Sequence, residues 1–148
     1  MIDHPNSPLV VEFRECDDLP GIYTVLFRFR AGWQSMHYRR AWERAWEIML
    51  ENLPEDAPCY ALCHFEAQPR LDQPGLLAEL VRVLRHPIVR RFTFTYVVGL
   101  DKYVSALAVR LEGVAEQLTG VHLPFALCDT LPHAFEMMRD HATQADSI

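Results

Sequence analysis

Apolar patterns with strand character alternate with patterns of helical period, and this alternation restricts the possible folds more than any other feature of the chain. Five short runs are rich in β-branched and aromatic residues, as strands are, and they cover residues 8–14, 22–30, 59–67, 91–98 and 123–128. Apolar residues recur at helical spacing in four further segments, which are 34–53, 73–85, 102–118 and the stretch that follows Thr130. The order of elements is therefore β-β-α-β-α-β-α-β-α.

This order predicts an α/β fold. Strands that alternate with helices form parallel sheets, whereas the first two strands are close enough in sequence to form an antiparallel hairpin. Residues 59–67 are apolar on both faces of a strand, as is typical of a central strand covered on both sides. We expect a single mixed, mostly parallel sheet of five strands with four helices.

The length of 148 residues suits one domain covering residues 1–148. A chain of this size buries ~68–70% of its unfolded surface and does not need a metal or a disulfide to fold. Residues 142–148 are polar, and we expect them to form a flexible tail.

Composition excludes several classes of function. The net charge is −6, from 14 basic and 20 acidic residues, which argues against binding to nucleic acid. No apolar run approaches the ~18 residues of a membrane-spanning helix. The first ten residues show neither a basic segment nor a long apolar one, so we expect no signal peptide and a cytoplasmic location.

One local sequence sharpens the prediction of fold. Residues 71–80 read LDQPGLLAEL and form the turn from the third strand into the second helix. Together with the order of elements, this turn resembles the STAS domain of anti-sigma factor antagonists and of related SpoIIAA-like proteins, over nearly the whole chain. Two other stretches are similar to that family, namely VVGLDKY before a long helix and the closing CDTLPHAFEMM.

The resemblance implies a control that this chain lacks. The family's turn reads Asp-Ser-Ser-Gly, with the phosphoacceptor serine before the glycine, and the corresponding residues here are Asp72, Gln73, Pro74 and Gly75. Neither Gln73 nor Pro74 can carry a phosphate. Asp72 suits a helix cap and Pro74 a first helical turn, so we expect a turn that begins a helix without acting as a switch.

The cysteines favour packing over chemistry. Cys59 and Cys63 would share one face of a strand while His64 faces the other, and the three would spread over ~13 Å, which does not suit a tetrahedral metal site. Asp129 beside Cys128 would raise the pKa of that thiol and so oppose its use as a nucleophile. We expect no metal, no cofactor and no catalysis.

The carboxyl ends of parallel strands meet at one edge of a sheet, where ligands bind in open α/β folds. The residues expected at this edge are Asp72, Gln73, Asp101, Lys102, Asp129 and Thr130, with Trp33 near its rim. Lys102 is the only lysine of the chain and stands near a helix N-terminus, where a cation opposes the helix dipole. A partner or an anion would explain it, and so would a simple ion pair with Asp101 or Asp72.

Three functions remain open from the sequence. The resemblance implies a non-catalytic regulatory module with a protein partner of the anti-sigma factor type, without the phosphorylation switch; a homodimer is also compatible with it. The alternative is a protein that binds a small lipophilic or anionic ligand, because residues 33–46 contain three tryptophans, of which at least one should remain partly exposed. A small enzyme that uses the strand-end residues is the third.

Overall fold

The computed structural model of the protein describes residues 6–70 and 75–146. Its strands are β1 (Leu9–Glu15), β2 (Tyr23–Phe29), β3 (Cys59–Phe65), β4 (Phe94–Val98) and β5 (Phe125–Cys128). Its helices are α1 (Ser35–Asn52), α2 (Leu76–Arg85), α3 (Ile88–Arg91), α4 (Lys102–Thr119) and α5 (Leu131–Asp146). Every predicted strand and all four predicted helices are present. The structure has one further helix, α3, which is a single turn after Pro87 and was not predicted.

The five strands form one sheet in the order β1-β2-β3-β4-β5, which is also their order along the chain. β1 runs antiparallel to β2, and β2, β3, β4 and β5 are parallel to one another. The predicted mixed, mostly parallel sheet is therefore confirmed. β3 lies at its centre, and six of its seven residues are buried, as the apolar run at 59–65 indicated.

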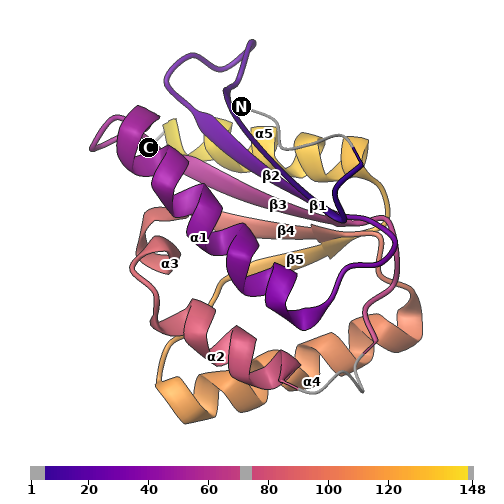
Figure 1. Ribbon diagram of the computed structural model, residues 1–148. Helices are drawn as coiled ribbons and strands as arrows, with labels where there is room; N and C mark the ends of the chain where they lie inside the picture. The colour runs from indigo at the N-terminus through magenta and orange to yellow at the C-terminus, as the bar shows by residue number, and fades with distance from the viewer. Residues whose placement is uncertain (1–5, 71–74, 147–148) are drawn as a thin grey trace.

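The helices form two unequal layers because of this strand order. Connections between parallel strands are almost always right-handed, so a sheet that grows in one direction places its crossover helices on one face. Accordingly α1, α2 and α4 cover one face and α5, which follows the last strand, packs on the other (Figure 1). The two faces have separate apolar cores.

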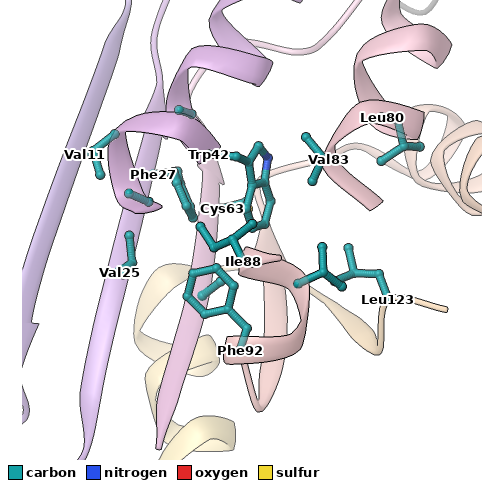
Figure 2. Packing of buried hydrophobic residues seen from close by; sticks show 14 of the residues in the cluster. Val11, Val25, Phe27, Trp42, Cys63, Leu80, Val83, Ile88, Phe92 and Leu123 are labelled. Carbon is teal, nitrogen blue, oxygen red and sulfur yellow. The ribbon is translucent and has the colours of Figure 1, made fainter. Parts of the chain in front are cut away.

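Trp42 is the centre of the larger core. It projects from α1 onto the sheet and is 1% exposed. Its ring lies 4.7 Å from that of Phe27 and 5.7 Å from that of Phe92, and Figure 2 shows Ile88 of α3 beside it. The short α3 thus closes the lower end of this core, since Ile88 is fully buried.

The smaller core lies under α5. Ala134, Met138 and Ala142 of this helix are buried against the sheet residues Tyr60 and Leu62. The hydroxyl of Tyr60 hydrogen-bonds Nδ1 of His141 at 2.8 Å. The tail expected to begin at residue 142 is therefore helical as far as Asp146, because Ala142 is 2% exposed and completes the packed face.

The predicted apolar stripe of α4 is only partly buried. Val104 is buried as expected, but Val114 is 44% and Leu118 58% exposed. The reason is that α4 lies chiefly against α2 and stands away from the sheet (Figure 1). On α1, similarly, Met36 and Leu50 were expected in the core and are exposed at 41% and 67%.

The turn that resembles the STAS phosphorylation turn lies mostly outside the described residues, as Asp72, Gln73 and Pro74 do. The described part begins at Gly75, which is the N-cap of α2 and has a φ of +86°. The carbonyl of Gly75 accepts the first helical hydrogen bond, from the N–H of Glu79 at 2.9 Å. A glycine suits this cap because other residues are strained at such a φ.

Candidate functional site

Asp101 and Lys102 lie at the predicted edge, where β4 ends and α4 begins. Asp101 is the N-cap of α4, and its Oδ1 accepts a hydrogen bond from the N–H of Val104 at 2.7 Å. Lys102 is exposed and forms no ion pair within the part of the chain that the structure describes, so the expected pair with Asp101 is not seen. Asp101 thus has a structural role, and Lys102 is available to solvent.

Asp129 and Thr130 lie next to this pair in the sheet, because β5 is the neighbour of β4. The Oγ1 of Thr130 accepts a hydrogen bond from the N–H of His133 at 3.3 Å and caps α5. The two turns begin side by side, yet α4 and α5 then pack on opposite faces of the sheet. The structure records no side-chain contact between these two pairs of predicted residues.

Trp33 differs from its expected place at the rim. It is 6% exposed, its ring packs against Phe29 and Phe65, and its Nε1 donates to the carbonyl of Ala67 at 3.2 Å. The tryptophan left partly exposed is Trp46, whose ring contacts His86 edge-on at 5.5 Å. Trp33 is therefore part of an interior wall, because the loop after β2 folds inward beneath the loop after β3.

The backbone at Gly99 packs closely against the backbone at Phe65 and holds together the loops at this edge of the sheet. Gly99 follows β4 with a φ of +93°, and a Cβ at this position would lie 2.5 Å from the backbone oxygen of Phe65. Gln68 joins the two loops by donating from Nε2 to the carbonyl of Gly99 at 2.6 Å and by accepting from the N–H of Asp101 at 3.0 Å. The start of α4 is thus held to the end of β3.

A cavity of about 100 Å³, partly open to solvent, lies beneath α4 on the face of the sheet that carries three helices. The sheet contributes Phe65, Val97 and Phe125 to its floor. The remaining lining residues are Trp33, Tyr38, Pro69, Leu76, Leu80, Leu100, Ala108, Leu111, Glu112 and Leu123. All thirteen are apolar or aromatic except Glu112.

The cavity exists because α4 presents small residues to the sheet. Ala108 and Ala115 lie on its inner side, where larger side chains would reach the strands. The helical spacing of residues 102–118 placed Ala108 on the inner stripe of this helix. The spacing does not show how far a helix stands from its sheet, so the cavity was not predicted.

Among the described residues that line the cavity, Glu112 is the only charged one. Its side chain is 13% exposed, and its Oε1 is inaccessible to solvent and accepts no hydrogen bond. The Nδ1 of His122 lies 3.6 Å from this oxygen and 3.2 Å from Oε2 of Glu116. These three side chains are close enough to surround a cation, with their ligand atoms all within 4.8 Å of one another.

The cysteines are placed as predicted. Cys59 and Cys63 are buried on the α1 side of the sheet, and His64 is on the other face. Burial raises the pKa of each of these two thiols to about 12. Burial, and then the charge of Asp129, also raises the pKa of Cys128, in the direction expected from sequence.

A second surface lies between α2 and α4. Leu77 and Val81 of α2 are half-buried there and face Leu111 and Leu118 of α4 across an open groove. The basic side chains Arg82 and Arg85 line the same groove. The groove is thus lined by apolar side chains with two arginines beside them, although the protein as a whole has a net charge of −6.

Comparisons with known proteins return no match, whether to protein-family models, to curated proteins or to solved structures. Over the described residues, no helix combines the length and the apolar character needed to cross a bilayer.

Proposed function

We propose that this protein is a non-catalytic binding protein that holds a small apolar ligand in the cavity between the sheet and helices α1, α2 and α4. The observation that carries the proposal is the cavity itself, in which all the described lining residues except Glu112 are apolar or aromatic. Binding sites for small molecules are typically concave and mostly apolar, with a few polar groups that orient the ligand. This arrangement favours the lipophilic alternative that the sequence left open.

The size of the cavity restricts the ligand. Sites for cofactors and drug-sized molecules measure roughly 300–1,000 Å³, whereas an apolar cavity of about 150 Å³ suffices for benzene or xenon. At about 100 Å³, this cavity is smaller and suits a single apolar atom such as xenon or a short alkyl segment. A nucleotide or a flavin would not fit without a large movement of α4.

The thiol of Cys63 and the phenol of Tyr38, both among the described residues, are held in their neutral forms, which favours binding without chemistry. Nucleophilic cysteines act as thiolates, and the raised pKa of Cys63 keeps its thiol protonated at neutral pH. Burial also raises the pKa of Tyr38, which lines the cavity, so its phenol stays neutral. Among the described lining residues, Glu112 is the one that carries a carboxylate, and its Oε1 lies 3.6 Å from Nδ1 of His122.

A matched pair of substitutions tests the proposal. Ala108 lines the cavity, and Ala106 is exposed on the same helix. Ala108→Phe should fill the cavity and abolish binding of a small apolar probe such as xenon, measured by ¹²⁹Xe NMR. Ala106→Phe should leave binding unchanged. Equal binding by both variants, each shown to be folded by circular dichroism, would contradict the proposal.

A second candidate function rests on the groove between α2 and α4. The resemblance to STAS domains implies a protein partner such as an anti-sigma factor, and the groove is an exposed apolar strip of the kind that binds an amphipathic helix. Arg82 and Arg85 favour a helix with acidic flanks. A second copy of this chain is disfavoured, because a two-fold contact through this groove would bring the arginines of the two copies together.

Native mass spectrometry separates the two functions. The protein would be purified from its own host as wild type and as the variants Leu118→Glu, Ala108→Phe and Lys102→Glu. Loss of an acidic protein partner in Leu118→Glu alone supports the groove, and loss of a small bound molecule in Ala108→Phe alone supports the cavity. A partner lost only in Lys102→Glu would instead favour the strand-end edge with Asp101, Asp129 and Thr130.

A further inference from the structure

Two carboxylates lie on the same side of α4 near its end. Glu112 and Glu116 are four residues apart, so they are neighbours on the helix surface, where like charges repel each other. Within the described part of the chain, the structure records no ion pair of either carboxylate with a lysine or an arginine, and both are paired with His122. A protonated His122 supplies one positive charge to two negative ones, whereas a divalent cation would balance both.

The backbone after α4 holds His122 against these carboxylates. Gly120 turns the chain back with a φ of +71°, and Leu123 is buried in the larger core. His122 lies between these two fixed points. Its Nδ1 is 3.6 Å from Oε1 of Glu112 and 3.2 Å from Oε2 of Glu116. The fold itself therefore brings one imidazole and two carboxylates together.

The separations match those between the ligands of a tetrahedral zinc ion. Zinc binds carboxylate oxygen and imidazole nitrogen at ~2.0–2.2 Å, and tetrahedral geometry then places neighbouring ligand atoms about 3.3–3.6 Å apart. The two distances from His122 are 3.2 and 3.6 Å, and one ligand atom from each of the three residues lies within 4.8 Å of the others. The side chain of Glu116 is 43% exposed, so it can turn to bring the carboxylates closer.

The shielding of Oε1 of Glu112 is compatible with such an ion. This oxygen is inaccessible to solvent and accepts no hydrogen bond, since it lies against the ring of His122. An ion would lie between the oxygen and the ring and would not need to enter through the cavity. The side chain of His122 is 59% exposed, so it can move aside to admit the ion from solvent.

We infer that Glu112, Glu116 and His122 bind a divalent transition-metal ion, for which Zn²⁺ is the best match. An imidazole ligand suits Zn²⁺ better than Mg²⁺ or Ca²⁺, which take oxygen ligands, and the cluster has no thiolate to favour Cu⁺. The ion would fasten the end of α4 to the segment before β5. The expectation of no metal rested on the cysteines and did not consider these residues, because they lie on either side of a helix end.

Isothermal titration calorimetry with Zn²⁺ and Mg²⁺, after treatment of the protein with a chelator, tests the site. We expect saturable binding of one Zn²⁺ per chain and much weaker binding of Mg²⁺. Loss of an outer-shell partner typically lowers metal affinity 10–100-fold, so loss of a direct ligand in Glu112→Gln or His122→Ala should lower the affinity for Zn²⁺ at least about ten-fold. Glu112→Gln keeps the shape of the side chain and His122→Ala changes an exposed one, so both variants should fold, as circular dichroism would check.

Helix α5 supplies the matched controls. His133 and Glu136 are exposed and lie outside the cluster, so His133→Ala and Glu136→Gln should bind Zn²⁺ as the wild type does. A wild type that binds no Zn²⁺ saturably, as a plain ion pair of His122 predicts, would overturn the inference. Equal affinity for Zn²⁺ and Mg²⁺, unchanged affinity in Glu112→Gln and His122→Ala, or an equal loss in the controls would also overturn it.

Discussion

Replacement of Gly99 by alanine tests how the edge of the sheet is built. A φ of +93° is a conformation that L-residues adopt at a cost of roughly 1–3 kcal/mol. The new Cβ would also lie 2.5 Å from the backbone oxygen of Phe65, and relieving such an overlap typically costs about 1–3 kcal/mol more. We therefore expect Gly99→Ala to lower the free energy of unfolding by roughly 2–6 kcal/mol.

A glycine in α4 provides the control. Gly113 is inside the helix, and a Cβ there would meet no heavy atom within 4 Å. Because glycine is a poor helix former, Gly113→Ala should stabilise the protein by roughly 0.5–1 kcal/mol. The two substitutions are the same in chemistry and opposite in expected sign.

Urea and thermal denaturation, both followed by circular dichroism, measure the two variants. For a domain of this size, ~1 kcal/mol shifts the melting temperature by ~2–4 °C, so Gly99→Ala should lower it by roughly 4–24 °C. A stability of Gly99→Ala within ~0.5 kcal/mol of the wild type, which is the usual range for neutral surface changes, would refute the proposed close approach of the β3 and β4 loops.

Three further predictions concern the core and its borders. Glu79, whose side chain is 12% exposed, has oxygens 3.1 Å from Arg82 and 3.5 Å from Arg39, so Glu79→Gln should cost about 1–2 kcal/mol. A double-mutant cycle with Arg39→Met should show coupling, and strict additivity would argue against the pair. Burial lowers the pKa of His37, and the unfolded state then binds more protons below about pH 6.5, so stability present above that pH is lost as the pH falls. His37→Ala should reduce this dependence of the melting temperature on pH, and an unchanged slope would count against it. The raised pKa values of Cys59 and Cys63 predict that neither reacts with a thiol reagent in the folded protein, and rapid labelling of either, located by mass spectrometry, would contradict their burial.

The sequence determined the fold through its periodicity. The strand runs and helical segments were recognisable because each had the period of its element, and the strand at residues 59–65 was identified as central from apolar residues on both faces. The short α3 was missed since four residues carry no period. The extent of α5 was underestimated because Ala142 is a single small residue among polar neighbours, yet it packs on the sheet.

The candidate site was harder to predict for a different reason. Periodicity shows which residues share a face of a helix, but not how far that helix stands from its sheet. The strip on α4 that includes Leu111 and Leu118 was therefore assigned to the core, whereas Leu118 is 58% exposed and Leu111 borders the cavity. Of the predicted strand-end residues, Asp101 and Lys102 follow β4 and Asp129 and Thr130 follow β5, but Asp101 and Thr130 are helix caps.

Xenon binding tests the central claim most directly, because it needs no knowledge of the natural ligand. Xenon occupies apolar cavities of this order of size, and its NMR chemical shift changes when it is bound. We predict a saturable shift of ¹²⁹Xe with the wild-type protein that is lost in Ala108→Phe and retained in Ala106→Phe. A wild-type protein that shows no saturable shift, or a shift unaffected by Ala108→Phe, would contradict the assignment of the cavity beneath α4 as the binding site.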